Sequence, residues 1–456
     1  MENHKLSAVP IPKLILGMSI PVIFSMMVQA LYNVVDSIFV SRVSEQALTA
    51  VSLAFPIQMI IVAAFVGLGT GINSNISRRL GEGNREEAIS VSEHGVVIGL
   101  ALSLVVAIIG ILLSGSYFTW FTDDLSIISD GKIYVQIVTA FAVFRILGHT
   151  GSSSLQGSGE MIKPMVAQLI GAIGNIILDP ILIFGWFGMP ALGVKGAAIA
   201  TITAQLFSML YIWSVIARGK QEIRLDMKRF RFSTVTIKSI VAVGVPSAIM
   251  QGLGSVMLGG LNLILAQFGE SALAVMGVYF KLQSLVYMPI FGLAVGTMPV
   301  VGFNFGAKNI RRMIAAVRFS TVLAVGFMSL WLVLFQLFPR QLLSIFNATP
   351  DMYSIGIDAM RIASVMFPMV AITIILSTSF NAIGKAHFSL AISSVRQLVI
   401  LLPVAYLLAK SIGVNGVWFS LVLSECVGVT LTVIIFTKVY RKIKASNEEL
   451  KRGLSV

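Results

Sequence analysis

The chain has 456 residues, of which 56% are hydrophobic and only 12% are charged. Soluble proteins carry about 25% charged residues, so this composition excludes a soluble enzyme and predicts an all-α polytopic membrane protein. The net charge of +13 does not predict nucleic-acid binding, because the basic residues are spread between apolar segments. The single Cys426 rules out a disulfide within one chain.

About twelve apolar segments are long enough to cross a ~30 Å hydrocarbon core, which takes about 20 residues. The first six cover residues 14–39, 47–74, 91–113, 133–157, 163–185 and 195–217. The second six cover residues 238–266, 273–303, 313–337, 354–382, 388–410 and 414–438. Little chain remains outside them, so there is no room for a catalytic domain and we do not expect an enzyme.

An internal repeat relates the two sets of six segments. At an offset of about 225 residues, Pro21 falls on Pro246 and the loop 80–84 falls on 305–309. Each half has an even number of crossings, so the repeat predicts two six-helix lobes related by a pseudo-two-fold axis along the membrane normal. The expected divisions are an N-lobe (1–217), a basic cytoplasmic linker (218–237), a C-lobe (238–438) and a charged cytoplasmic tail (439–456).

Most Lys and Arg residues lie at the N-terminus, in every second loop and in the tail, with the richest group at 218–238. By the positive-inside rule, this distribution places both termini in the cytoplasm. We therefore expect a multi-pass protein of the inner (plasma) membrane, in contact with anionic lipid headgroups and monomeric. The first apolar segment is too long for a cleavable signal.

Two acids lie inside apolar segments. Asp36 sits in the first, and an ionised Asp near the middle of a span costs about 2.5–3.5 kcal/mol on insertion scales. Such a residue faces a wet cavity, takes a proton or makes a helix–helix hydrogen bond. In the fifth segment, Asp179 and Asn175 are four residues apart and share a helix face. Pro180 follows, so Asp179 alternatively completes a turn that the proline breaks.

Four motifs follow one another along the chain. They are Leu-Tyr-Asn-Val-Val-Asp-Ser-Ile-Phe-Val at 31–40, Leu-Gln-Gly-Ser-Gly at 155–159, Asn-Ile-Ile-Leu-Asp-Pro-Ile-Leu-Ile-Phe at 175–184 and Gly-Val-Lys-Gly-Ala-Ala-Ile-Ala-Thr at 193–201. Together they resemble the multidrug and toxic compound extrusion (MATE) family, with the closest likeness to its DinF-like and MepA-like prokaryotic branch. The resemblance covers essentially the whole chain. It implies a twelve-helix, two-lobe fold and cation-coupled antiport of bulky, amphipathic, often cationic drugs by alternating access, with no cofactor besides the coupling ion.

The same resemblance assigns residues to the coupling site. Asp36 and Asp179 match the N-lobe acids of that branch, Asn175 matches their partner, and Thr201 lies near a hydroxyl position. Asn33 is close enough to Asp36 along the helix to line the site. We expect protons as the coupling ion; a sodium ion would instead take oxygens from Asp36, Asp179 and Asn175, and no other metal is expected.

One departure concerns the C-lobe. The NorM-like branch has a Glu in the seventh helix and an Asp in the tenth, whereas this chain has Gln251 in the seventh segment and no acid in the tenth. Coupling through the N-lobe acids is therefore expected.

Further polar and soft residues are candidates for cleft or substrate contacts, each with a structural alternative. Arg145 either pairs with an N-lobe acid or reaches toward an interface, and His149 either titrates or is a satisfied core residue. Glu425 is either a second cation site or the partner of Arg396. The remaining candidates are Tyr32, Gln29, Gln251, Met257 and Met288, of which the methionines are equally suited to face lipid.

Two alternatives to a drug exporter stay open. A flippase for a lipid-linked saccharide belongs to the same broader superfamily, although such proteins usually have additional spans and a cationic cleft. A channel or receptor lacks a filter-like loop or a ligand domain. No G-x-x-x-x-G-K-[ST] motif is present, which weighs against an ATP-driven pump, and Gly67–Gly71 is interpreted only as a small-residue helix face.

Overall fold

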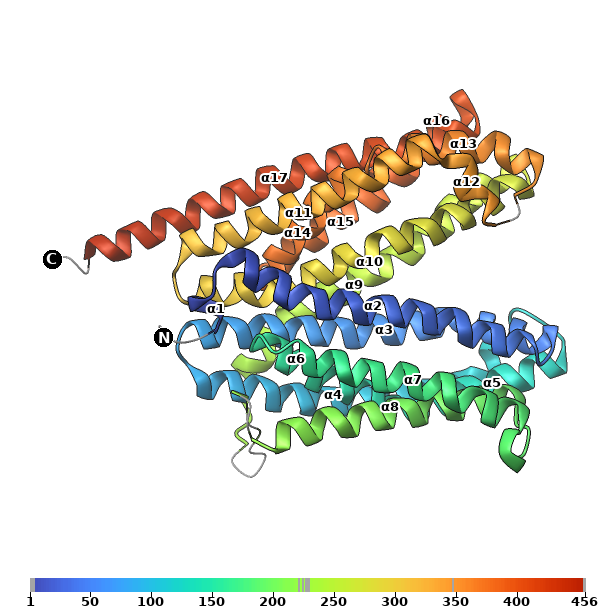
Figure 1. Ribbon diagram of the computed structural model, residues 1–456, viewed down its shortest axis with the longest axis horizontal. Helices are drawn as coiled ribbons and strands as arrows, with labels where there is room; N and C mark the ends of the chain where they lie inside the picture. Colours follow the sequence, from blue (N-terminus) through green and yellow to red (C-terminus); the bar gives the residue numbers. More distant parts are fainter. Residues whose placement is uncertain (1–4, 220–221, 224, 226–229, 347, 454–456) are drawn as a thin grey trace. The chain divides into compact units, whose positions relative to one another are not determined.

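The computed structural model describes residues 5–219, 222–223, 225, 230–346 and 348–453. The side chains of Asn33, Val34, Ser37 and residues 450–453 also lie outside the described set. Throughout the described residues the regular structure is helical, without a β-strand (Figure 1). The predicted all-α class is confirmed. Seven residues of the expected linker, 220–221, 224 and 226–229, fall outside the description.

Within the described residues, the first half of the chain forms eight helices and one short 3-10 turn. They are α1 (Lys5–Ala8), α2 (Ile11–Ser41), α3 (Glu45–Gly81), α4 (Arg85–Thr119), α5 (Leu125–Ala140), α6 (Ala142–Gly157), α7 (Ile162–Phe184), η1 (Trp186–Gly188) and α8 (Gly193–Ala217).

The second half forms a matching series with two short interruptions. Its elements are α9 (Thr234–Leu265), η3 (Ala266–Phe268), α10 (Glu270–Gly306), α11 (Ile310–Leu337), α12 (Pro339–Ser344), α13 (Pro350–Ser364), α14 (Phe367–Ala382), α15 (Ala386–Ser394), η4 (Val395–Leu401), α16 (Leu402–Ile412) and α17 (Val414–Gly453).

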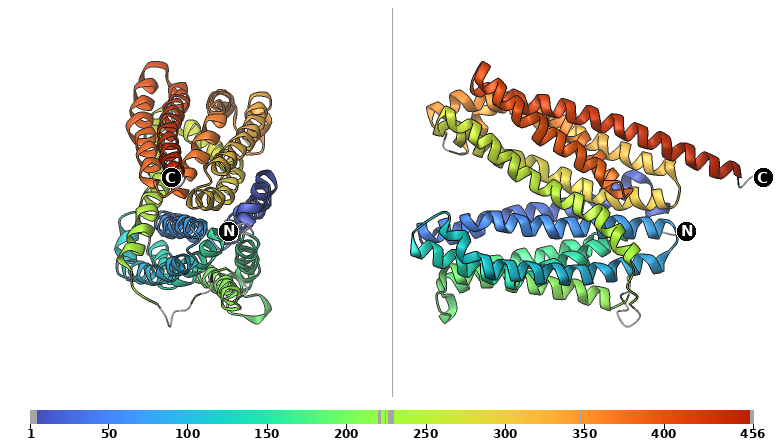
Figure 2. Two further views of the ribbon diagram at one scale, coloured as in Figure 1. Left: turned by 90° about the vertical axis from the view of Figure 1, so that its left-hand side faces the viewer. Right: turned by 180° about the vertical axis from the view of Figure 1, so that it is seen from behind.

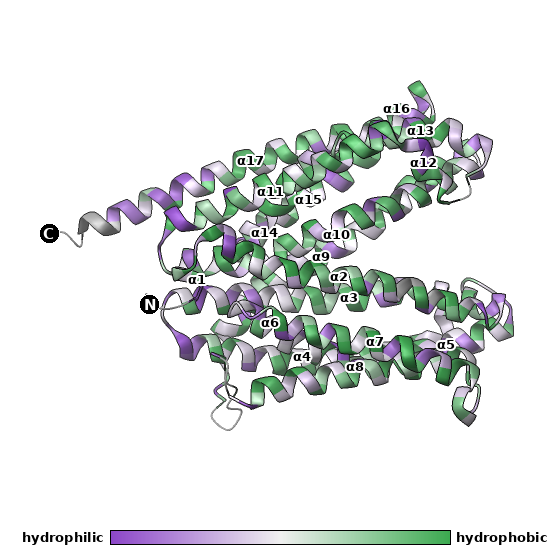
Figure 3. Ribbon diagram, in the orientation of Figure 1, coloured by the Kyte–Doolittle hydropathy of each residue, from purple (hydrophilic) through white to green (hydrophobic). Residues whose placement is uncertain are grey.

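Among the described residues, ten helices are long and apolar enough to cross a membrane. Two bent pairs, α5 with α6 and α13 with α14, bring the number to as many as 12 if each pair counts as one span. The bends are 43° and 48°. Apolar residues cover the middle of the helices, and hydrophilic residues gather near many of their ends (Figure 3). The number of crossings agrees with the twelve segments predicted.

The helices are longer than the predicted spans because hydropathy detects only their apolar part. Both α3 and α10 have 37 residues. The helices that follow them, α4 and α11, each begin after a polar N-cap residue. The Asn84 side chain accepts from the Glu87 backbone N–H at 3.1 Å, and Asn309 accepts from Arg312 in the same way. Residues 439–453 of the expected tail continue α17, whose 40 residues end beyond the other helices of the second half (Figure 2).

The described chain forms two compact units, and their borders fall inside helices. We call them the N-unit, Phe24–Ala248, and the C-unit, Met1–Ile23 with Ile249–Val456. The chain therefore enters the N-unit within α2 and leaves it within α9. Each border follows two residues after a helix-interior proline, Pro21 or Pro246. The expected lobes, 1–217 and 238–438, are defined by the sequence repeat and remain a prediction.

Within the C-unit, the first half of α2 packs on α10 through two glycines. A Cβ atom added to Gly296 would lie 2.8 Å from Ser19 Cα, and one added to Gly292 would lie 2.9 Å from Ile23 Cα. The Ser19 hydroxyl donates to the Leu293 carbonyl at 3.5 Å. Small residues at i and i+4 let two helix backbones approach closely, so α2 is seated in this glycine groove.

Within the N-unit, the first half of α9 is seated on α3 in the same way. A Cβ atom on Gly71 would lie 2.5 Å from the Ile240 carbonyl oxygen, and one on Gly67 would lie 2.6 Å from the Gly244 carbonyl oxygen. The Asn75 amide donates to the Ser239 carbonyl at 2.9 Å. The Gly67–Gly71 face, interpreted from sequence as an ordinary small-residue face, is thus the packing surface for α9.

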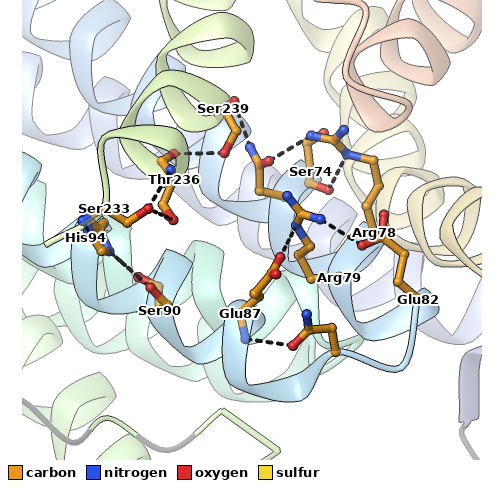
Figure 4. A network of polar contacts seen from close by, with 12 residues as sticks. Ser74, Arg78, Arg79, Glu82, Glu87, Ser90, His94, Ser233, Thr236 and Ser239 are labelled. Atoms are coloured by element: carbon orange, nitrogen blue, oxygen red, sulfur yellow. Dashed lines mark hydrogen bonds and ion pairs between the residues drawn. The ribbon is translucent and has the colours of Figure 1, made fainter. Parts of the chain in front are cut away.

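A polar network fixes the start of α9 to α3 and α4 (Figure 4). His94 is fully buried; its Nδ1–H donates to the Ser90 carbonyl and its Nε2 accepts from the Ser233 backbone N–H, both at 2.8 Å. Beside it, Arg79 pairs with Glu82 and with Glu87, each at 2.9 Å. The described end of the linker is therefore anchored to the N-unit.

Candidate functional site

Asp36, Asn175, Asp179 and Thr201 meet inside the N-unit, carried by α2, α7 and α8. The close packing of α7 on α8 brings the last three together: Gly196 leaves no room for a Cβ atom, which would lie 2.3 Å from the Leu182 carbonyl oxygen. Asn175, Asp179 and Thr201 are 2%, 0% and 8% exposed. The structure thus gathers four of the five residues predicted for coupling; the fifth, Asn33, has a side chain outside the described set.

The amide of Asn175 connects Asp179 to Thr201. Its Nδ2 donates to Asp179 Oδ2 at 2.7 Å, while its Oδ1 accepts from the Thr201 backbone N–H and hydroxyl, both at 3.2 Å. The reversed amide would point an oxygen at the carboxyl oxygen and leave both without a donor. Asn175 therefore presents a donor, not an oxygen ligand, to the acid.

The carboxyl groups of Asp36 and Asp179 share a side-chain hydrogen bond. An ionised carboxylate only accepts hydrogen bonds, so a hydrogen bond between these two groups requires that one of them holds a proton. Oδ1 of each aspartate is buried and receives no hydrogen bond from an amide, hydroxyl or cationic donor of the described residues. The pair therefore offers a place where one proton can be shared between two carboxyl groups.

Tyr32 lies one turn before Asp36 on α2 and hydrogen-bonds Thr201 through its hydroxyl. It interacts electrostatically with both acids and with Arg145. Sequence reasoning missed Tyr134 on α5, which is 4% exposed, interacts with the same acids and accepts a hydrogen bond from Gln58 Nε2 at 3.2 Å. Gln58 lies 225 residues before Gln283, so the repeat marks this glutamine, but it gives no sign of Tyr134.

Arg145 forms no ion pair with a carboxylate of the described residues, so its predicted pairing with an N-lobe acid is not seen. Its guanidinium lies over the Phe65 ring, 4.9 Å from the centroid. His149 packs edge-on against the same ring, with its ring centroid 4.8 Å from that of Phe65. A fixed cation thus lies in the N-unit with aromatic neighbours in place of a carboxylate.

The other substrate-contact candidates are scattered. Gln29 on α2 accepts from Gln168 Nε2 at 3.4 Å within the N-unit. In the C-unit, Gln251 is exposed, while Met257 and Met288 are half-buried. These three residues belong to the C-unit, whereas the acid pair belongs to the N-unit.

Glu425 belongs to a separate cluster inside the C-unit. It is 2% exposed, forms an ion pair with Arg396 and accepts from the Thr373 hydroxyl at 2.8 Å. Of the two interpretations of Glu425, the pairing with Arg396 is therefore the one observed. Among the described residues no three His, Cys, Asp or Glu side chains group as metal ligands.

A family model described as MatE matches the chain twice, over residues 21–181 and 246–407. The two matches begin at Pro21 and Pro246, the prolines that the repeat places in register. The duplication inferred from the sequence is therefore found independently by the family model, and the two matches together cover more than half of the chain.

Relatives of known description match almost end to end. A FAD transporter of Shewanella oneidensis is 25% identical, with 98% of this chain and 99% of the relative covered. The multidrug export protein MepA of Staphylococcus aureus is 24% identical, with 97% of each chain covered.

Solved structures with the same fold include a multidrug resistance MATE family transporter in an outward-facing conformation. It has a TM-score of 0.91 and 27% identity, with 98% of this chain and 99% of that chain covered. A MOP superfamily transporter from Pyrococcus furiosus has a TM-score of 0.90 and 27% identity, with 96% and 98% covered.

Proposed function

The chain belongs to the MatE family of membrane transporters, and we propose that it is a proton-coupled exporter of bulky, amphipathic, often cationic compounds. The observation that carries the proposal is the contact between the carboxyl groups of Asp36 and Asp179 inside the N-unit. A buried acid pair that holds one proton is a site where a second proton can bind and leave.

The geometry around the pair favours a proton over sodium. Sodium would need oxygen ligands, but the Asn175 amide turns its N–H toward Asp179 and its oxygen toward Thr201. Taking the shared proton away would leave two facing carboxylates in an apolar surrounding, where their repulsion is strong. The two acids therefore titrate as one unit.

Coupling follows if the protonated and deprotonated pairs prefer different conformations. A bound ion shifts the balance between inward-open and outward-open states only by its differential affinity for them. Adding a proton to the pair removes the remaining buried charge and allows α2 to repack against α7. Such a change in the N-unit would open the cargo site alternately to the two sides of the membrane, which is alternating access.

The cargo of this chain is proposed from its relatives and from one residue. The MepA relative is named for multidrug export, which supports drug-like cations. A second candidate is an anionic dinucleotide: the Shewanella relative is named a FAD transporter, and Arg145 is a cation without a carboxylate partner among the described residues. We place the protein in the inner membrane as a monomer with both termini cytoplasmic.

Transport by proteoliposomes tests the proposal. Wild type, Asp36→Asn, Asp179→Asn and the exposed control Asp123→Asn would be reconstituted at equal density. Ethidium, FAD and a lipid-linked pyrophosphate would each be offered under an imposed pH gradient and, separately, under a sodium gradient.

We expect a pH gradient to drive ethidium transport by wild type and Asp123→Asn, and both site variants to lose it. Transport driven by sodium alone, or full activity of Asp36→Asn, would contradict proton coupling at this pair. Lipid pyrophosphate as the preferred cargo would favour the flippase instead.

A further inference from the structure

The C-unit holds a buried carboxylate that is already neutralised. Glu425 on α17 is 2% exposed. Its Oε2 is paired with Arg396 Nη1, and its Oε1 accepts from the Thr373 hydroxyl at 2.8 Å. Both carboxylate oxygens therefore have a donor from the protein itself, each from a different helical element.

Two local features bring the Arg396 side chain to Glu425. Arg396 lies on η4, a seven-residue π-helical segment between α15 and α16, and such segments are rare and shift the direction of side chains along a helix. Its stem crosses α17 at Gly428, where a Cβ atom would lie 2.4 Å from Arg396 Cδ. Gly428 is three residues after Glu425, so the crossing sets the guanidinium beside the carboxylate.

The surroundings offer no other charge to Glu425 among the described residues. From α10, Gln283 Nε2 donates to the Tyr279 and Tyr287 hydroxyls at 3.3 and 2.9 Å, and both tyrosines interact electrostatically with Glu425. From α14 comes the neutral Thr373, and from η4 the cation Arg396. The carboxylate thus faces one permanent cation and neutral hydroxyl groups.

We propose that Arg396 is a built-in cation that keeps exchangeable ions away from the C-unit carboxylate. A carboxylate inside a membrane protein is stable only with a positive partner, which is a proton, a metal ion or a basic side chain. Protons and metal ions leave and return, whereas a guanidinium stays charged and tethered. Arg396 is thus a specificity-determining residue that makes Glu425 a non-exchanging acid.

The inference rests on the proposed function only in assigning ion exchange to Asp36 and Asp179. Its test therefore avoids transport and starts from purified full-length D36N/D179N protein, in which Glu425 is the remaining carboxylate of the two clusters. Into this background go R396Q, R396K, E425Q and the R396Q/E425Q pair. The readout is the thermal unfolding midpoint across pH and across Na⁺ replaced by N-methylglucamine at constant ionic strength.

We expect the background, R396K and R396Q/E425Q to share one profile. R396Q alone should gain a Na⁺- or pH-dependent rise in the midpoint, because its Glu425 must recruit a counter-ion from solution. Failure of R396Q to fold under any condition, with R396Q/E425Q folding normally, would equally show that Glu425 requires its cation.

Two results would overturn the inference. One is a background protein that responds to Na⁺ or pH through Glu425, so that E425Q removes the response. The other is a folded R396Q protein whose profile matches the background throughout. Because neither readout involves cargo, a failed export assay would leave this result intact, and the reverse also holds.

Discussion

Asn175 Nδ2 donates to Asp179 Oδ2 at 2.7 Å across one turn of α7. Replacing Asn175 with Leu keeps much of the volume and removes this donor. A hydrogen bond to a charged group contributes about 1.5–3 kcal/mol, and about 1.4 kcal/mol is a factor of ten in a rate. We expect pH-driven export in proteoliposomes to fall about tenfold or more. An unchanged rate at equal reconstitution would show that Asn175 does not contribute to proton coupling.

The Thr201 hydroxyl holds the other end of the same amide, at 3.2 Å from Asn175 Oδ1. Thr201→Val preserves the shape of the side chain but loses the hydroxyl, whereas Thr201→Ser retains it. We expect the Val variant to export more slowly and the Ser variant to keep most of the wild-type rate. Equal rates for the two variants would show that packing, not the hydroxyl, is what the position supplies.

Two glycines of α10 should respond oppositely to replacement by alanine, because only one of them lies in the glycine groove. Gly296→Ala would place a methyl group 2.8 Å from Ser19 Cα, and overpacking costs about 1–3 kcal/mol. Gly277→Ala on the same helix meets nothing within 4 Å, and Ala favours helix over Gly by about 1 kcal/mol. Thermal unfolding should therefore show a lower midpoint for Gly296→Ala and an equal or higher one for Gly277→Ala.

The His94 anchor makes a stability prediction. His94→Ala would leave the half-buried Ser233 N–H without its 2.8 Å acceptor, and an unsatisfied buried donor costs about 1–3 kcal/mol, which is an upper bound here. We expect a lower unfolding midpoint and little change for His387→Ala, whose side chain is exposed. A His94→Ala protein as stable as the wild type would show that water replaces the imidazole there.

Sequence patterns predicted the helical class, the number of crossings and the acid pair, because hydropathy and rare intramembrane charges report directly on burial in lipid. The helix bends and the π-helical segment η4 were not predictable from them. The 354–382 segment reads as one apolar run, yet it breaks after Ser364, where Pro368 in the first turn of α14 lacks an N–H to continue α13.

For each cluster, the sequence predicted the central acid better than the residues that contact it from other helices. Asn175 and Asp179 share a helix face, so spacing alone placed them together, but Tyr134 comes from α5 and Thr373 from α14, which no local period relates. For Arg145, pairing with an N-lobe acid was one of two predicted alternatives, and the structure places its guanidinium over the Phe65 ring instead. Contacts between helices depend on packing that a single sequence does not encode locally.

The reciprocal seating of the two half-helices has a genetic consequence. Severing the chain in the linker would give a front fragment whose residues 11–23 need the groove on α10, and a rear fragment whose residues 234–248 need the groove on α3. Each fragment would thus lack part of its own partner surface and carry part of the other's. Coexpression, rather than separate production, is what should restore a stable protein, as in any swapped dimer whose subunits have been fused.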